Sequence, residues 1–405
     1  MEPYRFEDAL TGKTVACTYP GLRAWVVEDA PASAGDRAAA GGGADADAAG
    51  AHGAGAGAGG EGAGAPAACT ALFFPGCSLV NYALPLVRSV YDLLAQAGRV
   101  DGMSLLCCGK ILSFEPDGQR VRAEFERQMC DHVVRAGVRR IVAACPNCVA
   151  ALRSALARDA RTADVQVDTL PQELANMGYR IDEGVLRRMV AAEAPVAPED
   201  VAVCVHDSCP DRSTGEFADG TRALLPGGVL VETAHVRNRS FCCGSLVRAA
   251  GKLEAADKQA RRHGEEAEAA GAAAVVTACV SCAFQLSTAQ RAVPVFHYLE
   301  LLYDWRVDWA HADQYMKLRF LFDAEPPAEA GNRAFVGLEG ACGAEDAGAG
   351  VGLRDAGAGS QGTADAAAGA MSGVDADAEG AALAPAGDEG GASGSAPAER
   401  DGADG

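Results

Sequence analysis

The sequence predicts an α/β protein made of two tandem, pseudo-symmetric βαβ-type repeats, with parallel sheets and with cysteines at the C-terminal strand ends. Two observations predict this fold class. Short apolar segments alternate with longer segments of helical periodicity, and the cysteine pattern of the first half recurs in the second half. Alternating strands and helices favour a parallel sheet, and recurrence at a fixed distance indicates a duplicated unit.

Two segments lie outside this pattern. Residues 30–68 consist almost wholly of Ala, Gly and Asp, and residues 324–405 are similar but carry scattered acids. Such segments have too few large apolar side chains to offset the entropy lost on ordering. We therefore predict a disordered linker at 30–68 and a disordered acidic tail at 324–405. The remaining predicted parts are a short N-terminal segment at 1–29, a first repeat at 69–195 and a second repeat at 196–323.

The negative charge belongs mainly to these flanking segments. The formal net charge is −20, and residues 324–405 hold 15 acidic but only 3 basic side chains. Residues 1–68 hold 9 acidic and 4 basic side chains, which leaves the two repeats nearly neutral. Because no basic stripe appears, a nucleic-acid partner is not expected. We interpret the tail as a solubilising appendage, with docking to a basic partner as the alternative.

The sequence shows no targeting or membrane-spanning pattern. The first residues, MEPYRFEDAL, lack a basic start followed by an apolar run, and no stretch reaches the roughly 18 apolar residues of a membrane span. We therefore expect a cytoplasmic protein. In that compartment structural disulfides are disfavoured, so clustered cysteines indicate metal binding or redox chemistry. The chain has 15 cysteines.

Ten of these cysteines form two copies of one pattern, a single cysteine followed by C-C-G and then by C-x-x-C. The single cysteine precedes the vicinal pair by 29 intervening residues in the first copy and by 32 in the second. The vicinal pair precedes C-x-x-C by 36 and then by 35 intervening residues. The first cysteine set is Cys77, Cys107, Cys108, Cys145 and Cys148. The second cysteine set is Cys209, Cys242, Cys243, Cys279 and Cys282.

Four short apolar segments end in a cysteine of these sets, and each is typical of a buried parallel strand. They are ALFFPGC (71–77), RRIVAAC (139–145), VAVCVHDSC (201–209) and AAAVVTAC (272–279). In parallel sheets, ligands bind beyond the carboxyl ends of the strands. The two cysteine sets are therefore expected at a ligand-binding edge.

Helical segments follow the predicted strands. Residues 83–98, 119–137 and 252–271 have helical apolar faces. Each C-x-x-C pair also opens a helical segment, where the helix N-terminus favours a thiolate. Residues 165–174 parallel residues 293–302, so each half is expected to end in a strand and a helix. Residues 13–28 could form one or two strands, but the sequence does not indicate their role.

The number of thiols in each set bears on what the sets bind. A structural zinc ion takes four ligands in a tetrahedron, whereas each set offers five cysteines. A redox disulfide within a vicinal pair would be strained and would leave C-x-x-C without a role. Iron–sulfur ligation suits a thiolate-rich site at strand ends and is the favoured interpretation. Zinc stays the alternative.

Six stretches carry a family resemblance: FFPGC, CCGK, ACPNC, HDSCPDR, FCCG and ACVSC. Together they resemble the CCG-domain (cysteine-rich domain) iron–sulfur proteins, of which the CCG-domain subunit of heterodisulfide reductase is the most similar type. The resemblance covers roughly residues 69–305. It implies that each cysteine set holds one [4Fe-4S] cluster of the noncubane type, and that the two clusters face each other. Adjacent thiolates would then bind different irons of one extended cluster.

The resemblance also implies a function. It indicates an oxidoreductase subunit that reduces a disulfide or a similar small acceptor between the clusters. An electron relay from a flavin dehydrogenase to a quinone and a zinc-bound scaffold are the alternatives. The chain lacks the ferredoxin-like motif C-x-x-C-x-x-C-x-x-x-C-P, so a ferredoxin-like iron–sulfur subunit and a flavoprotein or dehydrogenase are the expected partners. Any membrane association would be peripheral and through such partners.

One departure and a few single residues complete the prediction. CCGSLVRAAG replaces the glycine-rich continuation CCGxGG of many relatives, so the lining of the second cluster can differ. His206 precedes Cys209 and is either a structural histidine or a proton donor for disulfide reduction. His297 and Tyr298 have the same two interpretations. The cysteines predicted not to be ligands are Cys17, Cys69, Cys130, Cys204 and Cys342.

Overall fold

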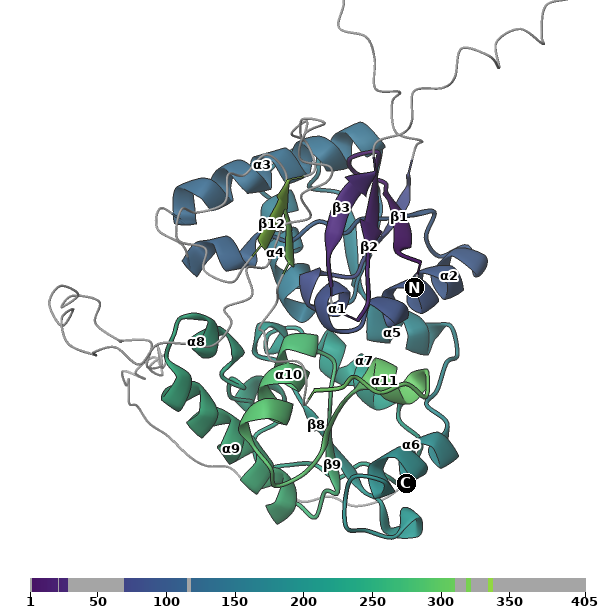
Figure 1. Cartoon of the computed structure of the whole chain (residues 1–405), viewed down its shortest axis with the longest axis vertical. Coiled ribbons are helices and arrows are strands. Elements are labelled where there is room, and N and C mark those ends of the chain that lie inside the picture. The colour runs from purple at the N-terminus through teal and green to yellow at the C-terminus, as the bar shows by residue number, and fades with distance from the viewer. Residues whose placement is uncertain are drawn as a thin grey trace, which may run out of the picture. The chain divides into compact units, whose positions relative to one another are not determined.

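The structure is a computed structural model of the chain (Figure 1). It describes residues 2–20, 22–27, 69–114, 118–309, 318–321 and 334–337. All of these residues belong to one compact unit, Met1–Leu353. The linker predicted at 30–68 lies outside the described residues, as does most of the predicted tail.

The first half is built on a parallel sheet whose central strand order is β5-β4-β6-β7. Each strand is a short apolar segment followed by a loop or a helix, as expected for βαβ units. Its strands are β4 (Ala71–Phe74), β5 (Gly102–Met103), β6 (Arg140–Ala143) and β7 (Gln166–Thr169). Its helices are α1 (Cys77–Tyr82), α2 (Leu84–Gln96), the 3-10 turn η1 (Lys110–Phe114), α3 (Gly118–Ala136), α4 (Pro146–Leu156) and α5 (Leu170–Asn176).

The second half repeats this plan. Its parallel sheet has the order β10-β9-β8, and an isolated bridge from Val203 to Leu230 takes the place of the β4–β5 pairing. The strands are β8 (Val203–His206), β9 (Ala274–Thr277) and β10 (Val295–His297). The helices are the 3-10 turn η3 (Cys209–Asp211), α7 (Glu216–Leu224), the 3-10 turn η4 (Arg237–Arg239), α8 (Ser245–Ala249), α9 (Leu253–Ala269), α10 (Val280–Ala289) and α11 (Tyr298–Leu302).

These elements confirm the predicted fold class. The helical segments predicted at 83–98, 119–137 and 252–271 are α2, α3 and α9. The predicted closing strand and helix of each half are β7 with α5 and β10 with α11. A helix and a 3-10 turn, α6 (Glu183–Ala191) and η2 (Pro198–Asp200), lie between the halves.

The N-terminal segment extends the first sheet, which the sequence did not reveal. Its strands, purple in Figure 1, form an antiparallel meander. They are β1 (Tyr4–Asp8), β2 (Lys13–Cys17) and β3 (Ala24–Val27). β1 pairs in parallel with β5 through Asp8 and Met103, so the complete sheet has seven strands in the order β3-β2-β1-β5-β4-β6-β7.

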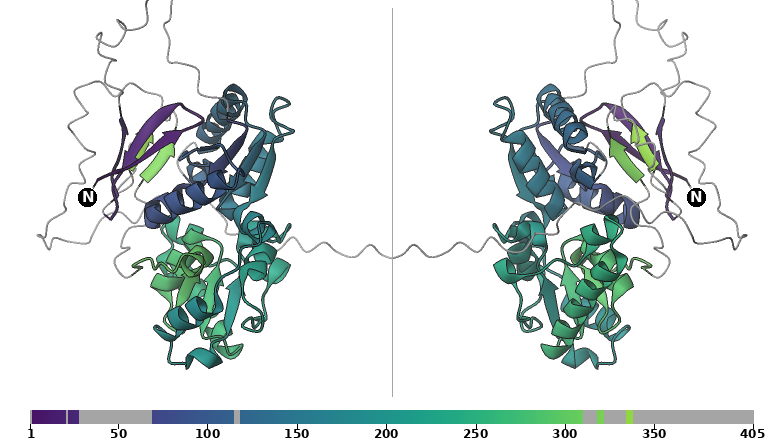
Figure 2. Two further views of the ribbon diagram at one scale, coloured as in Figure 1. Left: turned by 90° about the vertical axis from the view of Figure 1, so that its right-hand side faces the viewer. Right: turned by 90° about the vertical axis from the view of Figure 1, so that its left-hand side faces the viewer.

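A two-stranded parallel sheet lies near the C-terminal end of the described residues. It consists of β11 (Leu318–Leu321) and β12 (Ala334–Gly337), drawn in light green in Figure 2. β12 falls within the predicted tail, residues 324–405, of which the structure describes these four residues as a strand. The four-residue run AFVG is apolar enough to pair with LRFL, but the polar and glycine-rich average of the tail conceals it.

The apolar core continues from the first half into the second. One cluster of buried side chains includes Phe73 and Phe74 of β4 together with Val205 of β8 and Phe296 of β10. The ring of Tyr82 also stacks on Phe284, with ring centroids 5.1 Å apart. Burial of this apolar surface is the dominant favourable term for such a fold. Among the described residues, no helix has the length and apolar character needed to cross a membrane.

Candidate metal centres

The carboxyl ends of β4, β5 and β6 bring the first cysteine set together. Cys77 opens α1 after β4, and Cys145 caps α4 after β6. Gly76, which directly precedes Cys77, has a positive φ of 77°. A Cβ at Gly76 would lie 2.9 Å from Cys148 Sγ and 3.2 Å from Cys145 Cβ. Glycine is therefore needed here both for its backbone conformation and for its lack of a side chain.

The five thiols of the first set form a chain of contacts. Cys77 and Cys107 have their Sγ atoms 3.9 Å apart. Cys108 hydrogen-bonds to the thiols of Cys107 and Cys148, and Cys145 hydrogen-bonds to Cys148. All but Cys145 are buried, and Cys145 is half-buried. The structure thus brings all five predicted residues to one place.

The second set converges in the same way at the ends of β8 and β9. Cys243 Sγ lies 3.3 Å from Cys282 Sγ, and Cys209 Sγ lies 4.0 Å from Cys242 Sγ. Cys279 hydrogen-bonds to Cys282, and Cys243 hydrogen-bonds to Cys242, so the contacts join all five residues. The backbone N–H of Gly244 donates to Cys242 Sγ at 3.4 Å. Cys209 and Cys242 are half-buried, and the other three are buried.

The pKa shifts of neighbouring thiols in the first set have opposite directions. Hydrogen bonds from the Cys107 and Cys148 thiols lower the pKa of Cys108, whereas the contacts with Cys108 and Cys145 raise the pKa of Cys148. Such a contact favours a thiolate on one sulfur and a retained proton on its neighbour. Like charges at this separation in a buried site repel strongly.

The second set shows the same division. Hydrogen bonds from Cys209 and Cys243 lower the pKa of Cys242, and the contact with Cys242 raises the pKa of Cys209. Contacts with Cys243 and then Cys279 raise the pKa of Cys282. A bound cation would remove the conflict, because metal ligation deprotonates a thiol outright.

The sulfur spacing fits such a cation. Two thiolates on one tetrahedral metal with bonds of about 2.3 Å lie roughly 3.8 Å apart. The measured Sγ–Sγ distances of 3.3, 3.9 and 4.0 Å bracket this value. The donor atoms are all sulfur, which selects soft metals and iron–sulfur clusters. The two sets of buried, clustered cysteines therefore indicate a metal or iron–sulfur cofactor.

The two sets also touch each other. The Cys148 thiol lowers the pKa of Cys145, but a hydrogen bond to Cys279 and burial raise it to about 12. Cys279 belongs to the second set and Cys145 to the first, so one sulfur–sulfur contact connects the two centres. Beside it, the hydroxyls of Ser78 and Ser281 lie 2.7 Å apart. The two centres are thus neighbours.

His206 lies against the second set. One ligand atom of His206, Cys243 Sγ and Cys282 Sγ all lie within 4.8 Å of one another. Burial lowers the pKa of His206 to about 4, which leaves the imidazole neutral near pH 7. The role of His206 as a proton donor stays a prediction. His297 and Tyr298 are also buried, at the junction of β10 and α11.

Two residues near His206, namely His263 and Phe241, were missed by the sequence analysis. The His263 ring meets the His206 ring edge-on, with centroids 4.4 Å apart, and it stacks on Phe241 at 3.9 Å. A small cavity of about 10 Å³, bordered by His206, His235 and His263 among others, lies behind them. Superimposing the helical segments 119–137 and 252–271 could have drawn attention to His263, because Met129 occupies its place in the first half.

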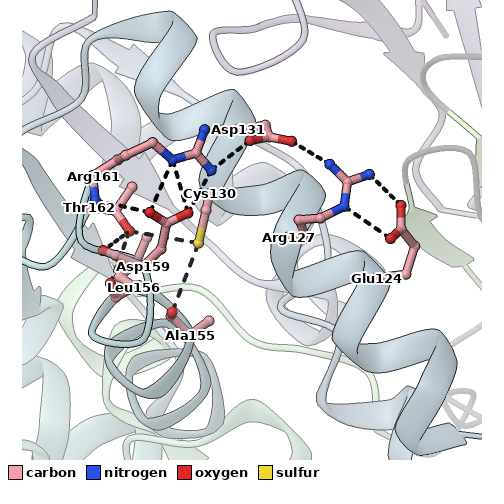
Figure 3. A network of polar contacts seen from close by, with 9 residues as sticks. All are labelled: Glu124, Arg127, Cys130, Asp131, Ala155, Leu156, Asp159, Arg161 and Thr162. Carbon is pink, nitrogen blue, oxygen red and sulfur yellow. Dashed lines mark hydrogen bonds and ion pairs between the residues drawn. The ribbon is translucent and has the colours of Figure 1, made fainter.

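Four of the five cysteines predicted not to be ligands lie in the described residues. Cys130 has its own partners, as Figure 3 shows: its thiol lies 3.9 Å from the Ala155 carbonyl oxygen and accepts from Thr162 Oγ at 3.7 Å. Cys17, Cys69 and Cys204 are buried, and burial is the first cause that raises the pKa of each to about 12. Cys342 lies outside the described residues.

Comparison with known proteins supports the repeat. A family described as CCG, cysteine-rich domain, matches residues 71–153 and again residues 203–287. The two matched ranges hold one cysteine set each. No curated protein matches the sequence.

The solved structures that resemble this chain include several racemases, all at low similarity. Glutamate racemase RacE1 of Bacillus anthracis has 11% identity and a TM-score of 0.26, with 57% of the present chain and 77% of that chain covered. The Aquifex pyrophilus glutamate racemase has 12% identity and a TM-score of 0.27, with 57% and 80% covered. The Campylobacter jejuni subsp. jejuni glutamate racemase has 15% identity and a TM-score of 0.26, with 63% and 93% covered. These scores support no functional assignment.

Proposed function

We propose that the chain, which matches the CCG cysteine-rich domain family at residues 71–153 and 203–287, is an iron–sulfur oxidoreductase subunit. Its two cysteine sets would hold two [4Fe-4S] clusters of the noncubane type. Its reaction would be the reduction of a disulfide or a similar small acceptor, as in the CCG-domain subunit of heterodisulfide reductase. The observation that carries the proposal is the convergence of two five-thiol sets that lie next to each other, where the hydroxyls of Ser78 and Ser281 are 2.7 Å apart and the Cys145 thiol interacts with Cys279.

The chemistry requires electrons and protons in equal number. Reduction of a disulfide breaks the sulfur–sulfur bond, consumes two electrons and two protons, and releases two thiols. The bound clusters would supply the electrons one at a time. The chain's own cysteines would hold the clusters and shield them from water, because most members of both sets are buried. The half-buried Cys145, Cys209 and Cys242 mark where an acceptor could approach.

The electrons must come from another protein in this proposal. The chain has no ferredoxin-like cysteine motif, so we infer a ferredoxin-like iron–sulfur subunit as the immediate donor and a flavoprotein or dehydrogenase behind it. The protein would work in the cytoplasm, where its thiols stay reduced. Peripheral membrane association would arise only through such partners.

An electron relay toward a quinone is the second candidate. The contact between Cys145 and Cys279 favours it as well, because neighbouring centres pass electrons whatever the final acceptor is. The two candidates differ only in the acceptor. Protein reduced with viologen and offered a panel of disulfides and quinones would distinguish them. Turnover of disulfides alone supports the reductase, and turnover of quinones alone supports the relay.

Metal analysis tests the cofactor itself. Anaerobically purified protein should be brown and contain about eight irons per chain, from two four-iron clusters. Cys108→Ser and Cys243→Ser should each remove about half of the iron, because each breaks one set. Cys130→Ser is the matched control, since this buried cysteine lies outside both sets. A colourless protein with stoichiometric zinc, or full iron in both set variants, would overturn the assignment.

A further inference from the structure

We propose that His206 is a nitrogen ligand of the centre held by the second cysteine set, so that the two centres have different ligands. This inference rests on the proposed function for the nature of the metal group. Its geometric basis is the group formed by His206, Cys243 and Cys282, whose ligand atoms lie within 4.8 Å of one another. Such mutual distances allow all three atoms to reach one metal site.

The unsatisfied nitrogen of His206 supports ligation. Its Nε2 atom is buried and has no hydrogen-bond partner among the described residues, and the side chain is only 6% exposed. Burying a polar atom without a partner is costly, so such atoms in native proteins generally have an explanation. A metal at the Cys243–Cys282 pair would satisfy the nitrogen, and neutral imidazole is a common metal ligand.

The first half cannot offer the same ligand. In its sheet, Phe74 pairs with Ala143, and in the second sheet His206 pairs with Thr277 at the corresponding register. Phe74 therefore occupies the place of His206, and a phenyl ring has no donor atom. The two halves are duplicates in fold but not in the chemistry of this position.

Neighbouring rings hold the imidazole in place. The His263 ring packs edge-on against His206, and the Phe241 ring stacks on His263. Phe241 directly precedes Cys242, so the ring stack is anchored to the second cysteine set. A ligand needs such support, because residues around a metal site orient the ligands.

The nitrogen ligand would leave the charge of the second ligand set unchanged, because neutral imidazole adds no negative charge to the five thiolates. A cysteine at position 206 would instead add a sixth thiolate, and iron–sulfur centres with histidine in place of cysteine have higher reduction potentials. The second centre should therefore have a higher potential with His206 than with a thiolate at that position.

Isotope labelling of histidine tests this directly. Protein containing ¹⁵N-histidine would be purified anaerobically, and its paramagnetic centres would be studied by pulsed electron paramagnetic resonance. We expect a strongly coupled nitrogen whose frequency changes between the ¹⁴N and ¹⁵N samples. The coupling should disappear in His206→Phe, which reproduces the first half, and in His206→Cys, which keeps a metal-binding side chain. It should persist in His297→Thr, which removes another buried histidine of the same half.

The outcomes separate this inference from the proposed function. Full iron and normal cluster signals without any histidine coupling would overturn the ligand assignment while leaving the clusters in place. Coupling that persists in both His206 variants would overturn it as well. Protein without iron would instead contradict the proposed function. A redox titration adds a second readout, since His206→Cys should lower the potential of one centre and leave the other unchanged.

Discussion

Gly76 shows how one residue can shape a thiol site. Its φ is 77°, a value that residues with a side chain rarely adopt. A Cβ added at this position would lie very close to Cys148 Sγ and Cys145 Cβ. The second half has Ser208 at this position, and its hydroxyl lies 4.0 Å from Cys282 Sγ. The first centre thus depends on the absence of a side chain, whereas the second carries a polar group there.

Gly76→Ala should therefore damage the first centre. The added methyl group would push against the Cys148 sulfur, so we expect loss of up to about half of the bound iron. Gly98→Ala is the matched control, because Gly98 also has a positive φ but has no atom within 4 Å of its added Cβ. Both variants should lose roughly 1–2 kcal/mol of stability from backbone strain. Equal iron in both variants would contradict this account of Gly76.

At the scale of single residues, the sequence predicted that the cysteines of each set come together, but it did not predict which side chains surround them. Both cysteine sets converge as their spacing indicated, because cysteines at the ends of parallel strands meet at one edge of the sheet. The ring stack beside His206 could not be predicted in the same way. His263 lies 57 positions later and on another element, so only the folded chain shows that the two rings meet.

At the scale of elements, β1 has a specific task. Asp8 at its end is fully buried and accepts hydrogen bonds from Ser104 Oγ and Leu105 N–H, both at 2.8 Å. This segment leads directly into Cys107 and Cys108. Asp8 also accepts from the N–H groups of Leu10 and Thr11, both at 3.1 Å. The N-terminal meander thus fixes the loop that carries the first vicinal pair.

This task could not be predicted from the sequence. Asp8 and Ser104 are separated by 96 positions, and the intervening linker hides which strand β1 will join. The pairing of β1 with β5 involves only one residue pair, Asp8 and Met103. Neither strand has enough length to produce a pattern that points to the other.

Asp8→Asn should loosen the first centre. The amide would present N–H donors to groups that themselves donate, and an unsatisfied buried donor costs about 1–3 kcal/mol. We expect a lower denaturation midpoint and faster iron release to a chelator. Glu7→Gln is the control, since Glu7 is an exposed neighbour on the same strand. Equal iron release from the two variants would show that Asp8 does not support the cysteine loop.

His297 makes the second half sensitive to acid. It is buried at the start of α11, and burial lowers its pKa from 6.5 to about 4. Between pH 6.5 and about pH 4, His297 binds a proton in the unfolded chain but not in the folded chain. The free energy of unfolding therefore falls as the pH is lowered through this range. One such histidine accounts for roughly 3 kcal/mol over this range.

His297→Thr should remove that pH dependence. Threonine stands at the equivalent helix start in the first half, where Thr169 caps α5, and it does not titrate. Denaturation at pH 7 and pH 4.5 would be compared for both proteins. We expect the wild type to lose more stability than the variant between these two pH values. Parallel losses in the two proteins would mean that His297 is protonated in the folded state.

At the scale of the whole molecule, the duplication was predictable but the asymmetry between the halves was not. Both halves share one strand order, as the repeated cysteine pattern indicated. Among the described residues, only the first sheet is extended by an N-terminal meander, and only the first cysteine set has the strand β11 hydrogen-bonded to its backbone. The N–H of Cys107 donates to the Phe320 carbonyl oxygen at 2.7 Å. The amino-acid composition of these flanking segments did not indicate that they have a structural role.

β11 covers the first centre and should protect it. Phe320 is fully buried, and β11 contacts α1, the helix that begins at Cys77. A chain ending at residue 309 would lose this cover and the hydrogen-bond partner of Cys107. We expect its cluster absorbance to decay several-fold faster in air than that of the full chain.

Two further chains separate this effect from general damage. A chain ending at Leu353 keeps the whole first compact unit, so its decay in air should equal that of the full chain. Phe320→Ala keeps the backbone acceptor but removes the buried ring, which typically costs about 3–5 kcal/mol of stability, and its decay should be intermediate. Equal decay in all four proteins would show that β11 does not shield the centre. Faster decay in the Leu353 chain would assign the protection to the segment beyond that residue, because only that segment would then differ from the full chain.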